Sequence, residues 1–333
     1  MQSIGIIGGG AWGTALGLVA LRAGREPLLW AREPEVVASI NDKRENALFL
    51  PGIALDPRFR ATSELAEAGA RDVVMLAAPA QHLRAIARAL APHLKSGTPV
   101  VICAKGIEEH SGALLSEVVA QALPQATVAL LSGPTFAAEV ATGHPTAITL
   151  AASDAALGQH LVQALGSRAF RPYYTDDVVG AQIGGAIKNV IAIACGIVLG
   201  RKLGDNARAA LITRGLAEMA RLALAKGGRA ETLMGLSGLG DLTLTCTSLQ
   251  SRNCSLGAAL GEGKSLADIL AARRSVAEGV TSAAAAAELA QRVGVEMPIV
   301  AAVDAILHRG AAIDAAIESL LSRPFRSESR ASS

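Results

Sequence analysis

The 333-residue sequence is poor in aromatic and charged residues. Phe, Trp and Tyr make up 3% of it and charged residues 18%, whereas hydrophobic residues reach 51%. The cores must therefore be built from Ala, Leu, Val and Ile, and a chain of this length is long enough for two domains. The 31 Lys and Arg nearly balance 29 Asp and Glu, without a basic run interleaved with aromatics. We therefore expect no nucleic-acid partner.

Cysteine is also scarce, and the four cysteines form neither a CxxC pair nor a zinc-ligand spacing: Cys103, Cys195, Cys246 and Cys254. We expect packed, reduced thiols and no bound metal. The start, MQSIGIIGGG, lacks the basic and long apolar regions of a signal peptide. The apolar run 183–200 approaches the length of a membrane span, but Lys188, Asn189 and several glycines interrupt it. The sequence therefore predicts a cytoplasmic protein without a membrane span.

The first half of the chain alternates short apolar runs with helical patterns. Strands are expected at 3–7, 27–30, 72–77, 99–104, 127–132 and 146–151, with helices near 12–24, 34–40, 80–91 and 112–123. This alternation predicts a parallel sheet with crossover helices on both faces. Beyond residue 177 only helices are expected, at 178–200, 206–226, 256–261, 266–272, 282–292, 296–308 and 313–321. The expected fold is α/β: a Rossmann-type parallel-sheet domain (1–177), an all-helical substrate domain (178–325) and a flexible tail (326–333).

A glycine pattern follows the first expected strand. Gly8, Gly10 and Gly13 form GxGxxG where a strand turns into a helix. In this setting the pattern predicts a dinucleotide site, because the glycines allow a tight turn, approach of a pyrophosphate and close packing of helix on strand. The N–H groups at the helix start then face the phosphates. A glycine-rich turn without a ligand is the alternative.

The end of the second strand bears on the choice of cofactor. An acidic residue here accepts hydrogen bonds from the ribose 2′-hydroxyl of NAD, whereas an Arg suits the 2′-phosphate of NADP. The sequence has Arg32, followed by Glu33. NADP(H) is therefore the preferred expectation, with NAD(H) open, and Arg32 as a plain surface residue is the alternative.

Lys188 lies in the stretch GGAIKNVIAIACGIVLG, which is otherwise small or aliphatic. A buried lysine without a partner costs several kcal/mol or loses its proton. Either its stem carries the ammonium group out to solvent, or a reaction requires the group there. The flanking glycines and the amide of Asn189 favour the second interpretation.

Polar residues cluster in the segment GLSGLGDLTLTCTSLQSRNCSLG, 235–257, which we expect to be a structured loop leading into a helix near Cys254. They are Asp241, Thr245, Ser251, Arg252 and Asn253. A guanidinium beside helix N–H groups forms an anion site. Helix capping is the alternative, and it could explain Asn253 by itself.

Two further segments end strands of the expected sheet. CAKGIE places Lys105 directly after a strand, and LLSGPTFAAEV does the same with Gly133 and Thr135 before a short helix. Ligands of open α/β sheets bind at the carboxyl ends of the strands. We therefore expect these residues to line the same site.

The motifs GGGAWGTALG, CAKGIE, SGPTFAAEV, GAIKNVIAIACGI, AALITRGLAEM and GLGDLTLTCTSLQSRN occur in this order over almost the whole chain. Together they closely resemble bacterial NAD(P)-dependent sn-glycerol-3-phosphate dehydrogenase. The resemblance implies an oxidoreductase that reversibly reduces dihydroxyacetone phosphate to sn-glycerol 3-phosphate for glycerophospholipid synthesis.

The resemblance also implies roles for individual residues. Lys188 matches the catalytic lysine. The substrate-lining positions are matched by Lys105, Gly133, Thr135, Asp241, Ser251, Arg252 and Asn253. Beside the three glycines, the nucleotide-lining positions are matched by Ala11, Trp12, Arg32, Lys105, Ala137, Arg252, Val276 and Glu278.

Residue chemistry agrees with this assignment. Ketone reduction needs a hydride and a proton, and a lysine can supply the proton if its pKa falls toward neutrality. Apolar surroundings and a second cation such as Lys105 would lower the pKa of Lys188, and Asp241 would orient its ammonium group. Arg252 and Asn253 would anchor the phosphate.

Three alternatives remain open from the residues. A related dehydrogenase acting on a hydroxy acid or sugar acid would use Arg252 for a carboxylate, and a sugar-nucleotide oxidising enzyme would need a nucleophile such as Cys195. A non-catalytic dinucleotide sensor would not need Lys188.

The Ala-rich helices of the second half could supply a homodimer interface.

Overall fold

Eight strands of the N-terminal half pair into one sheet in the order β3-β2-β1-β4-β5-β6-β7-β8. The computed structural model describes residues 1–272 and 277–325. The strands are β1 (Ser3–Ile7), β2 (Glu26–Trp30), β3 (Arg60–Thr62), β4 (Val73–Leu76), β5 (Pro99–Ile102), β6 (Thr127–Ser132), β7 (Thr146–Ala151) and β8 (Phe170–Thr175). The chain moves outward from β1 first on one side and then on the other, which confirms the Rossmann-type prediction.

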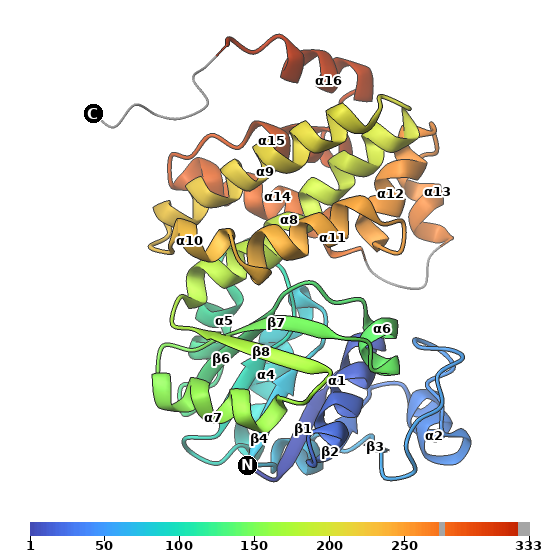
Figure 1. The fold of residues 1–333 in the computed structure, drawn as a ribbon, viewed down its shortest axis with the longest axis vertical. Coiled ribbons are helices and arrows are strands. Elements are labelled where there is room, and N and C mark those ends of the chain that lie inside the picture. Colours follow the sequence, from blue (N-terminus) through green and yellow to red (C-terminus); the bar gives the residue numbers. More distant parts are fainter. Residues whose placement is uncertain (273–276, 326–333) are drawn as a thin grey trace.

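Helices cover both faces of this sheet (Figure 1). Successive strand residues belong to different cores, as Met75 and Leu76 do, because side chains alternate across a strand. On one face lie α1 (Ala11–Arg22), α2 (Pro34–Lys43), α6 (Ala137–Thr142) and α7 (Ala155–Leu165). On the other lie α3 (Leu65–Gly69), η1 (Ala80–His82), α4 (Leu83–Leu90), η2 (Ala91–His93) and α5 (Leu115–Ala122).

One strand departs from the purely parallel sheet that we expected. β7 runs antiparallel to β6, while the other neighbouring strands pair in parallel. The connection between them contains only α6, whose six residues span about 9 Å at 1.5 Å per residue. A six-residue strand is about 20 Å long. The chain does not cross back over the sheet here, so β7 starts near the edge where β6 ends and runs back beside it.

Two strands were missed by the sequence prediction. β3 has only three residues, too few for a pattern. β8 ends the sheet, has the sequence FRPYYT and contains Pro172, which cannot donate a ladder hydrogen bond. Proline is tolerated on an edge strand, so tertiary pairing with β7 places this polar segment in the sheet.

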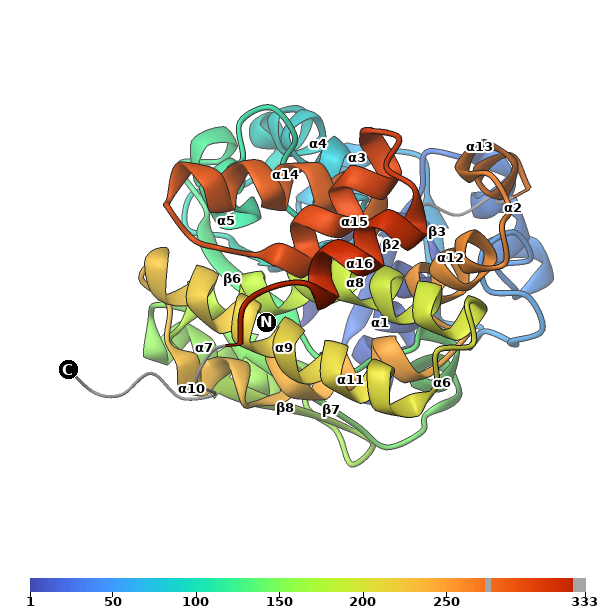
Figure 2. The ribbon, with the colours of Figure 1, turned by 90° about the horizontal axis from the view of Figure 1, so that it is seen from above.

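The second half of the described chain is helical. Its helices are α8 (Val178–Gly200), α9 (Asp205–Ala225), α10 (Ala230–Leu233), η3 (Leu236–Gly240), α11 (Asp241–Thr247), α12 (Arg252–Gly261), α13 (Leu266–Ala271), α14 (Glu278–Arg292), α15 (Pro298–His308) and α16 (Ile313–Leu321). α8 runs through the middle, with α9, α11, α12, α14 and α15 packed around it (Figures 1 and 2).

Helix α8 is long and apolar enough to cross a membrane, and it is the one such helix among the described residues. In the structure 83% of its most apolar window is buried inside the protein. Glycines bring it close to α12: a Cβ on Gly196 would overlap the carbonyl oxygen of Cys254, and one on Gly257 would overlap that of Ile193. α8 is therefore the core helix of this half.

The segment 235–257 is mostly helical, so the prediction of a loop was wrong. A π-helical turn, η3, leads directly into α11, and only 248–251 separate α11 from α12. Leu242 and Cys246 of α11 are fully buried in the core around α8. Burial of these apolar side chains on one face outweighs the low helix propensity of the glycines and threonines around them.

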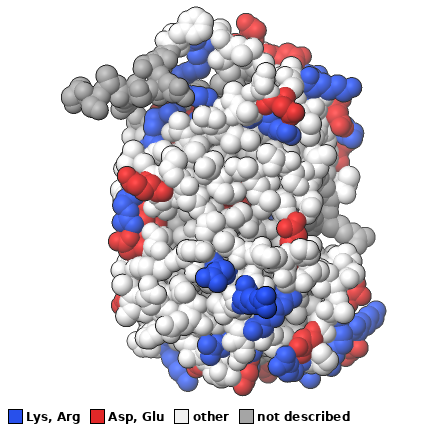
Figure 3. Space-filling view, viewed as in Figure 1, with Lys and Arg blue, Asp and Glu red and all other residues white. Residues whose placement is uncertain are grey.

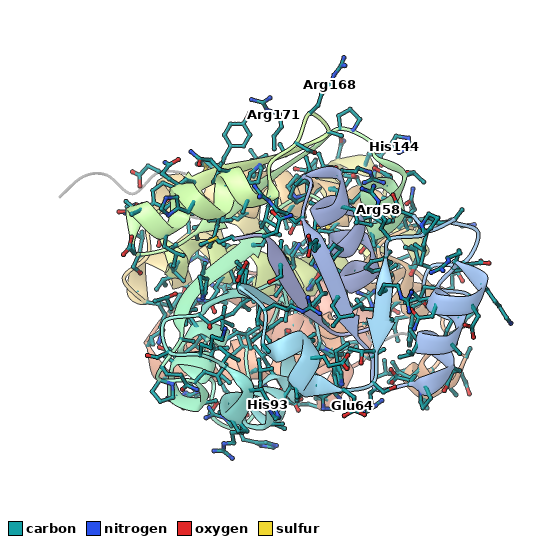
Figure 4. The ribbon with its side chains drawn as sticks, turned by 90° about the horizontal axis from the view of Figure 1, so that it is seen from below. Arg58, Glu64, His93, His144, Arg168 and Arg171 are labelled. Atoms are coloured by element: carbon teal, nitrogen blue, oxygen red, sulfur yellow. The ribbon has the colours of Figure 1, made fainter. Side chains whose placement is uncertain are left out.

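Charged side chains lie mainly at the surface. On the face seen in Figure 3, acidic and basic residues are interspersed toward the margins, and much of the middle carries neither. From below, Arg168 and Arg171 lie at one margin of the sheet half and His93 at the other (Figure 4). Lys188, Glu218 and Asp241 of the helical half are buried and are exceptions to this distribution.

Candidate active site

The glycine loop joins β1 to α1 as predicted, and its three glycines differ in their surroundings. Gly8 has φ +131°, a conformation that side chains disfavour. A Cβ on Gly13 would overlap the carbonyl oxygen of Gly8, so this glycine allows α1 to pack on the loop. A Cβ on Gly10 would meet nothing within 4 Å. Gly10 therefore leaves open space in front of the helix N-terminus.

A buried amide holds this loop in place. Asn46 Nδ2 donates to the carbonyl oxygen of Gly9 and to Thr14 Oγ1, at 2.8 Å each, and Asn46 Oδ1 accepts from the Phe49 N–H at 3.1 Å. The Thr14 hydroxyl also donates to the Gly10 carbonyl at 3.0 Å. With these carbonyls engaged, the loop presents its N–H groups. Asn46 lies 36 residues beyond Gly10, and no local pattern in the sequence indicated its role.

The expected nucleotide-lining residues of the sheet half lie around this loop. Ala11 and Trp12 begin α1, and Ala137 begins α6, which packs on α1. The indole Nε1 of Trp12 is buried and has no hydrogen-bond partner among the described residues. Arg32 follows β2, is 77% exposed and forms an ion pair with Glu33 at 2.9 Å.

These features fit a dinucleotide. The open space at Gly10, an α1 N-terminus without a side-chain cap and the unpartnered Trp12 N–H offer room and donors for an anionic group. The glycine loop would hold the pyrophosphate, and Arg32 stands where the second ribose is expected.

The chemical centre is a carboxylate between two lysines. Lys188 Nζ lies 2.6 Å from Asp241 Oδ1, and Lys105 Nζ lies 2.6 Å from Asp241 Oδ2. Asp241 is completely buried, and the side chains of Lys105 and Lys188 are 13% and 8% exposed. Lys105 comes from the end of β5, Lys188 from α8 and Asp241 from α11. Lys188 does not extend to solvent, so the first of the two sequence interpretations is wrong.

This environment shifts the proton affinity of Lys188. Burial lowers its pKa to about 8, the negative charge of Asp241 opposes the shift, and the positive charge of Lys105 adds to it. The ammonium group also donates to Thr245 Oγ1 at 2.9 Å. Thr245 is the fifth residue of α11, one turn after Asp241, and the two face Lys188 together. A loop was expected here, so Thr245 was predicted only as a member of a polar cluster and not as a partner of Lys188.

Lys105 connects this centre to the end of β6. Its Nζ donates to the Gly133 carbonyl at 3.0 Å, and the Thr135 hydroxyl donates to the same oxygen at 3.2 Å. Gly133 has φ +159° and packs against Ile148. The three residues that end β5 and β6 therefore lie together, as the sequence predicted.

The residues of the expected anion-binding site lie at the N-terminus of α12, and their side chains make different contacts. Ser251 is the N-cap, and its hydroxyl accepts from the Cys254 N–H at 3.2 Å. Arg252 is exposed at the first helical position. Asn253 is 7% exposed, and its side chain contacts Asn189 of α8 and Gly279 of α14. The capping alternative therefore applies to Ser251, whereas Asn253 joins helices.

Glu278 begins α14 beside these groups. Burial raises the pKa of its carboxyl, and the nearby positive charges of Arg252, Lys105 and Lys188 oppose that shift, in this order. The structure thus brings Glu278 into the same charged cluster as both lysines. Val276, also expected to line the nucleotide, lies outside the described residues, as does the tail 326–333.

The cysteines do not form a catalytic centre. All four are buried and free. Burial raises the pKa of Cys254 to about 11 and that of Cys246 well above its ordinary value, so both stay protonated thiols. Cys195 is fully buried in α8. The alternative with Cys195 as a nucleophile therefore has no support from the geometry.

A cavity of about 490 Å³ lies at the opposite, amino-end edge of the sheet, lined in part by four arginines. Arg25 donates to the Ala164 carbonyl at the end of α7, and Arg71 to the Glu67 carbonyl of α3. Arg58 pairs with Asp56 at 2.7 Å. These guanidinium groups stabilise helix ends and a turn, so this cavity is not the expected site.

Comparisons with known proteins agree with this geometry. Residues 3–158 match the model for the N-terminus of NAD-dependent glycerol-3-phosphate dehydrogenase, and 177–318 match the C-terminus. A relative from Parvibaculum lavamentivorans, named an NAD(P)+ glycerol-3-phosphate dehydrogenase, is 58% identical over 98% of both chains. The chain belongs to this dehydrogenase family.

Further likenesses extend over the same length. A glycerol-3-phosphate dehydrogenase, NAD(P)+, of Rhodospirillum rubrum is 59% identical over 98% of this chain and 94% of its own. The crystal structure of glycerol-3-phosphate dehydrogenase from Coxiella burnetii superimposes with a TM-score of 0.93 at 39% identity, covering 97% and 99% of the two chains. The glycerol-3-phosphate dehydrogenase resemblance is therefore confirmed, and the protein is an NAD(P)-dependent oxidoreductase. The hydroxy-acid and sensor alternatives lose their support.

Proposed function

We propose that the protein interconverts dihydroxyacetone phosphate and sn-glycerol 3-phosphate, with Lys188 as the group that moves the proton. The observation that carries this proposal is the buried Lys105–Asp241–Lys188 cluster beside the carboxyl ends of β5 and β6. When bound, NAD(P)H supplies the hydride. This chain's residues must then bind the ketone, orient it and protonate its oxygen.

Lys188 is suited to that proton transfer. With a pKa of about 8, its ammonium group is mostly charged at neutral pH, yet it is a far stronger acid than an exposed lysine. Asp241 fixes the position of the Nζ atom through one oxygen, and Thr245 accepts a second N–H. The remaining N–H of Lys188 can be donated to the substrate oxygen, where the positive charge of Lys105 also stabilises a developing alkoxide.

The phosphate is assigned to the N-terminus of α12. Arg252 offers a planar, bidentate donor there, and the helix start adds N–H groups. The binding energy of the substrate phosphate would hold the reacting carbon next to Lys188. Gly133, Thr135 and Ser251 line the same space in this proposal.

The cofactor preference, the biological setting and the domain boundary are also part of the proposal. NADP(H) is the preferred cofactor because Arg32 replaces the acidic residue that NAD-specific sites carry. The protein acts in the cytoplasm in glycerophospholipid synthesis, as a homodimer that associates through its helical half. The substrate domain is proposed to start at residue 178, the first residue of α8.

The test is oxidation of NADPH by dihydroxyacetone phosphate, followed by absorbance, for wild type, Lys188→Ala and the exposed-lysine control Lys95→Ala. We expect turnover in wild type and Lys95→Ala, and a loss of about 10³-fold or more in Lys188→Ala. NADPH binding, followed by fluorescence, should be equal in all three proteins. Folded, cofactor-binding wild type without turnover would refute the substrate assignment, and equal turnover in Lys188→Ala would refute the role of the lysine.

A further inference from the structure

The segment after Lys105 packs into the helical half, although it connects two elements of the sheet half. It runs from the end of β5 to the first turn of α5. Within it, Ile107 and Leu114 pair as an isolated β-bridge, and both are buried in the core that surrounds α8. We call residues 106–117 the docking segment.

The docking segment contributes to both cores of the protein. Leu114 packs in the core around α8, whereas the next residue, Leu115, packs on the sheet with Ile102 of β5. Because the core changes between adjacent residues, a shift of one half against the other must strain this segment. The segment therefore joins the two halves beside the candidate site.

Lys105 lies directly before this segment. Only Gly106 separates it from buried Ile107, and Gly106 has φ +156° in a crowded turn. A Cβ on Gly106 would lie 2.8 Å from the Cβ of Ala80. Since the turn has little room to adjust, the packing of Ile107 in the helical core also fixes the backbone position of Lys105.

Gln182 of α8 forms a buried tie to the docking segment. It is 5% exposed, its Oε1 accepts from the Ser116 N–H at 2.9 Å, and its Nε2 donates to Ser116 Oγ at 2.7 Å. A backbone N–H only donates, so the atom of Gln182 that faces it must be the oxygen. Two hydrogen bonds between the same two residues restrict both the distance and the rotation of α5 against α8.

Two charged side chains hold the same segment from other helices. Arg292 Nη1, at the end of α14, donates to the Ser111 carbonyl at 2.8 Å. Lys226, the C-cap of α9, lies 3.2 Å from Glu117. Both contacts are partly exposed, and solvent and salt weaken contacts of this kind. Gln182 is therefore the tie whose loss should have the largest effect.

We propose that Gln182 is a positioning residue, which holds the docking segment on α8 through Ser116 and thereby keeps the Lys105 ammonium group against Asp241. Lys105 Nζ lies 2.6 Å from Asp241 Oδ2, yet the two residues come from different halves. Their contact therefore depends on how the halves are joined. This inference rests on the proposed function only where turnover is measured, and two further measurements do not need turnover.

The kinetic test compares Gln182→Met, which keeps the length of the side chain and removes both hydrogen bonds, with Ser116→Thr, which keeps them. Gln125→Met is the matched control, because Gln125 Nε2 donates to the Ala91 carbonyl at 3.0 Å within the sheet half. We expect Gln182→Met to lower kcat for dihydroxyacetone phosphate by about 10- to 100-fold, since a displacement of about 1 Å costs on the order of 10²-fold. The other two variants should stay near wild type, and an unchanged kcat in folded Gln182→Met would overturn the proposal.

Chemical labelling of Lys105 reports its position without turnover. The Lys105 side chain is 13% exposed, and acetic anhydride acetylates amines that reach solvent. With exposed Lys95 as the internal reference, mass spectrometry should show the acetylation rate of Lys105 rising about fivefold or more in Gln182→Met. Gln125→Met should leave this rate unchanged. Equal rates in wild type and Gln182→Met would refute the role of Gln182 in positioning Lys105.

Hydrogen exchange at the Ser116 amide tests the tie itself. Gln182→Met removes the acceptor of this N–H, so its exchange rate should rise about tenfold or more, and unchanged exchange would contradict the docking. If Gln182→Met does not fold, Ser116→Ala, which loses one of the two bonds, takes its place. A smaller rise in the acetylation of Lys105 is then expected, and an unchanged rate refutes the proposal. Wild type inactive on dihydroxyacetone phosphate, with these labelling and exchange changes in Gln182→Met, would refute the proposed function and leave the docking role standing.

Discussion

The sheet half and the helical half build their parts of the site from different chemistry. At the end of β1 the sheet half offers backbone: a loop of glycines, a helix N-terminus and an amide that donates to the Gly9 carbonyl of the loop. The helical half offers buried charge, with the side chain of Asp241 at 0% and that of Lys188 at 8% exposure. A backbone site needs only local conformation, whereas a buried charge needs partners from several elements to offset its desolvation.

Substituting Ala for Gly13 or for Gly10 in the glycine loop tests this contrast most directly. Gly13→Ala should destabilise the protein by about 1–3 kcal/mol, because its Cβ would overlap the Gly8 carbonyl oxygen. Gly10→Ala should cost less than about 1 kcal/mol, because Gly10 has φ −70° and its Cβ would meet nothing within 4 Å, although Ala is a poorer N-cap than Gly. It should nonetheless weaken NADPH binding by about tenfold or more, since its methyl group enters the open space of the loop.

The two variants are compared by urea denaturation and by NADPH fluorescence titration. Unaltered NADPH affinity in Gly10→Ala would place the pyrophosphate elsewhere. A Gly13→Ala protein as stable as wild type would contradict the packing of α1 on the loop.

Glu218, a second buried ionisable residue of the helical half, has no part in the proposed reaction and tests the cost of desolvation. Glu218 of α9 is 1% exposed and accepts the N–H groups of Ile299 and Val300 at the start of α15. Burial raises the pKa of its carboxyl to about 7, against the hydrogen bonds from those two residues. Because the folded state holds the proton more tightly than the unfolded chain, this group's stabilisation is greatest in acid and is lost as pH rises through about 7.

We therefore expect the free energy of unfolding of wild type to fall, relative to Glu218→Gln, by about 2.5 kcal/mol between about pH 5 and about pH 8. Urea denaturation across this pH range measures the difference. The exposed control Glu64→Gln should give a constant difference from wild type. Parallel curves for wild type and Glu218→Gln would contradict the raised pKa.

The pH dependence of turnover tests Lys188 itself. Its pKa of about 8 means that reduction, which uses the ammonium form, should slow above about pH 8. Oxidation of sn-glycerol 3-phosphate uses the neutral amine and should speed up across the same range. Measured kcat profiles that shift in the same direction for both reactions would assign the proton to another group.

The smallest expected effect is at Arg32 in the sheet half. Arg32→Ser should lower the preference for NADPH over NADH, measured as the ratio of kcat/KM, by about fivefold, because ion pairs of exposed side chains contribute about 1 kcal/mol at most. Arg58→Ser is the matched control, since Arg58 is 72% exposed and pairs with nearby Asp56. An unchanged ratio would show that Arg32 is a surface residue that does not contribute to the choice of cofactor.

The same contrast explains which features could be predicted. GxGxxG is a local pattern, so the loop, β1 and α1 followed from the sequence, and the long apolar run of α8 gave its bounds at 178–200. Lys188 was identifiable because a charge inside such a run is costly. Asn46 could not be found, because its bond to Gly9 depends on a loop 37 residues away in the chain.

In the segment 235–257, the local sequence predicted the wrong secondary structure. Its glycines and threonines have low helix propensity, and the burial of Leu242 and Cys246 against α8, which makes it helical, is a tertiary effect. The loop prediction therefore concealed the one-turn spacing of Asp241 and Thr245. The contacts of Asn253 with α8 and α14 were concealed in the same way, because its partners lie 64 and 26 residues away.

The carboxylate of Asp241 also links the arrangement of the two halves to acid–base chemistry. Lys105 belongs to the sheet half, whereas Lys188 and Asp241 belong to the helical half. If the halves move apart, Lys105 leaves, water reaches Lys188, and both changes raise the pKa of that lysine. With the two halves apart, the Lys188 ammonium group would therefore be a weak acid. Only with the halves together would its pKa be low enough for it to give a proton to a substrate.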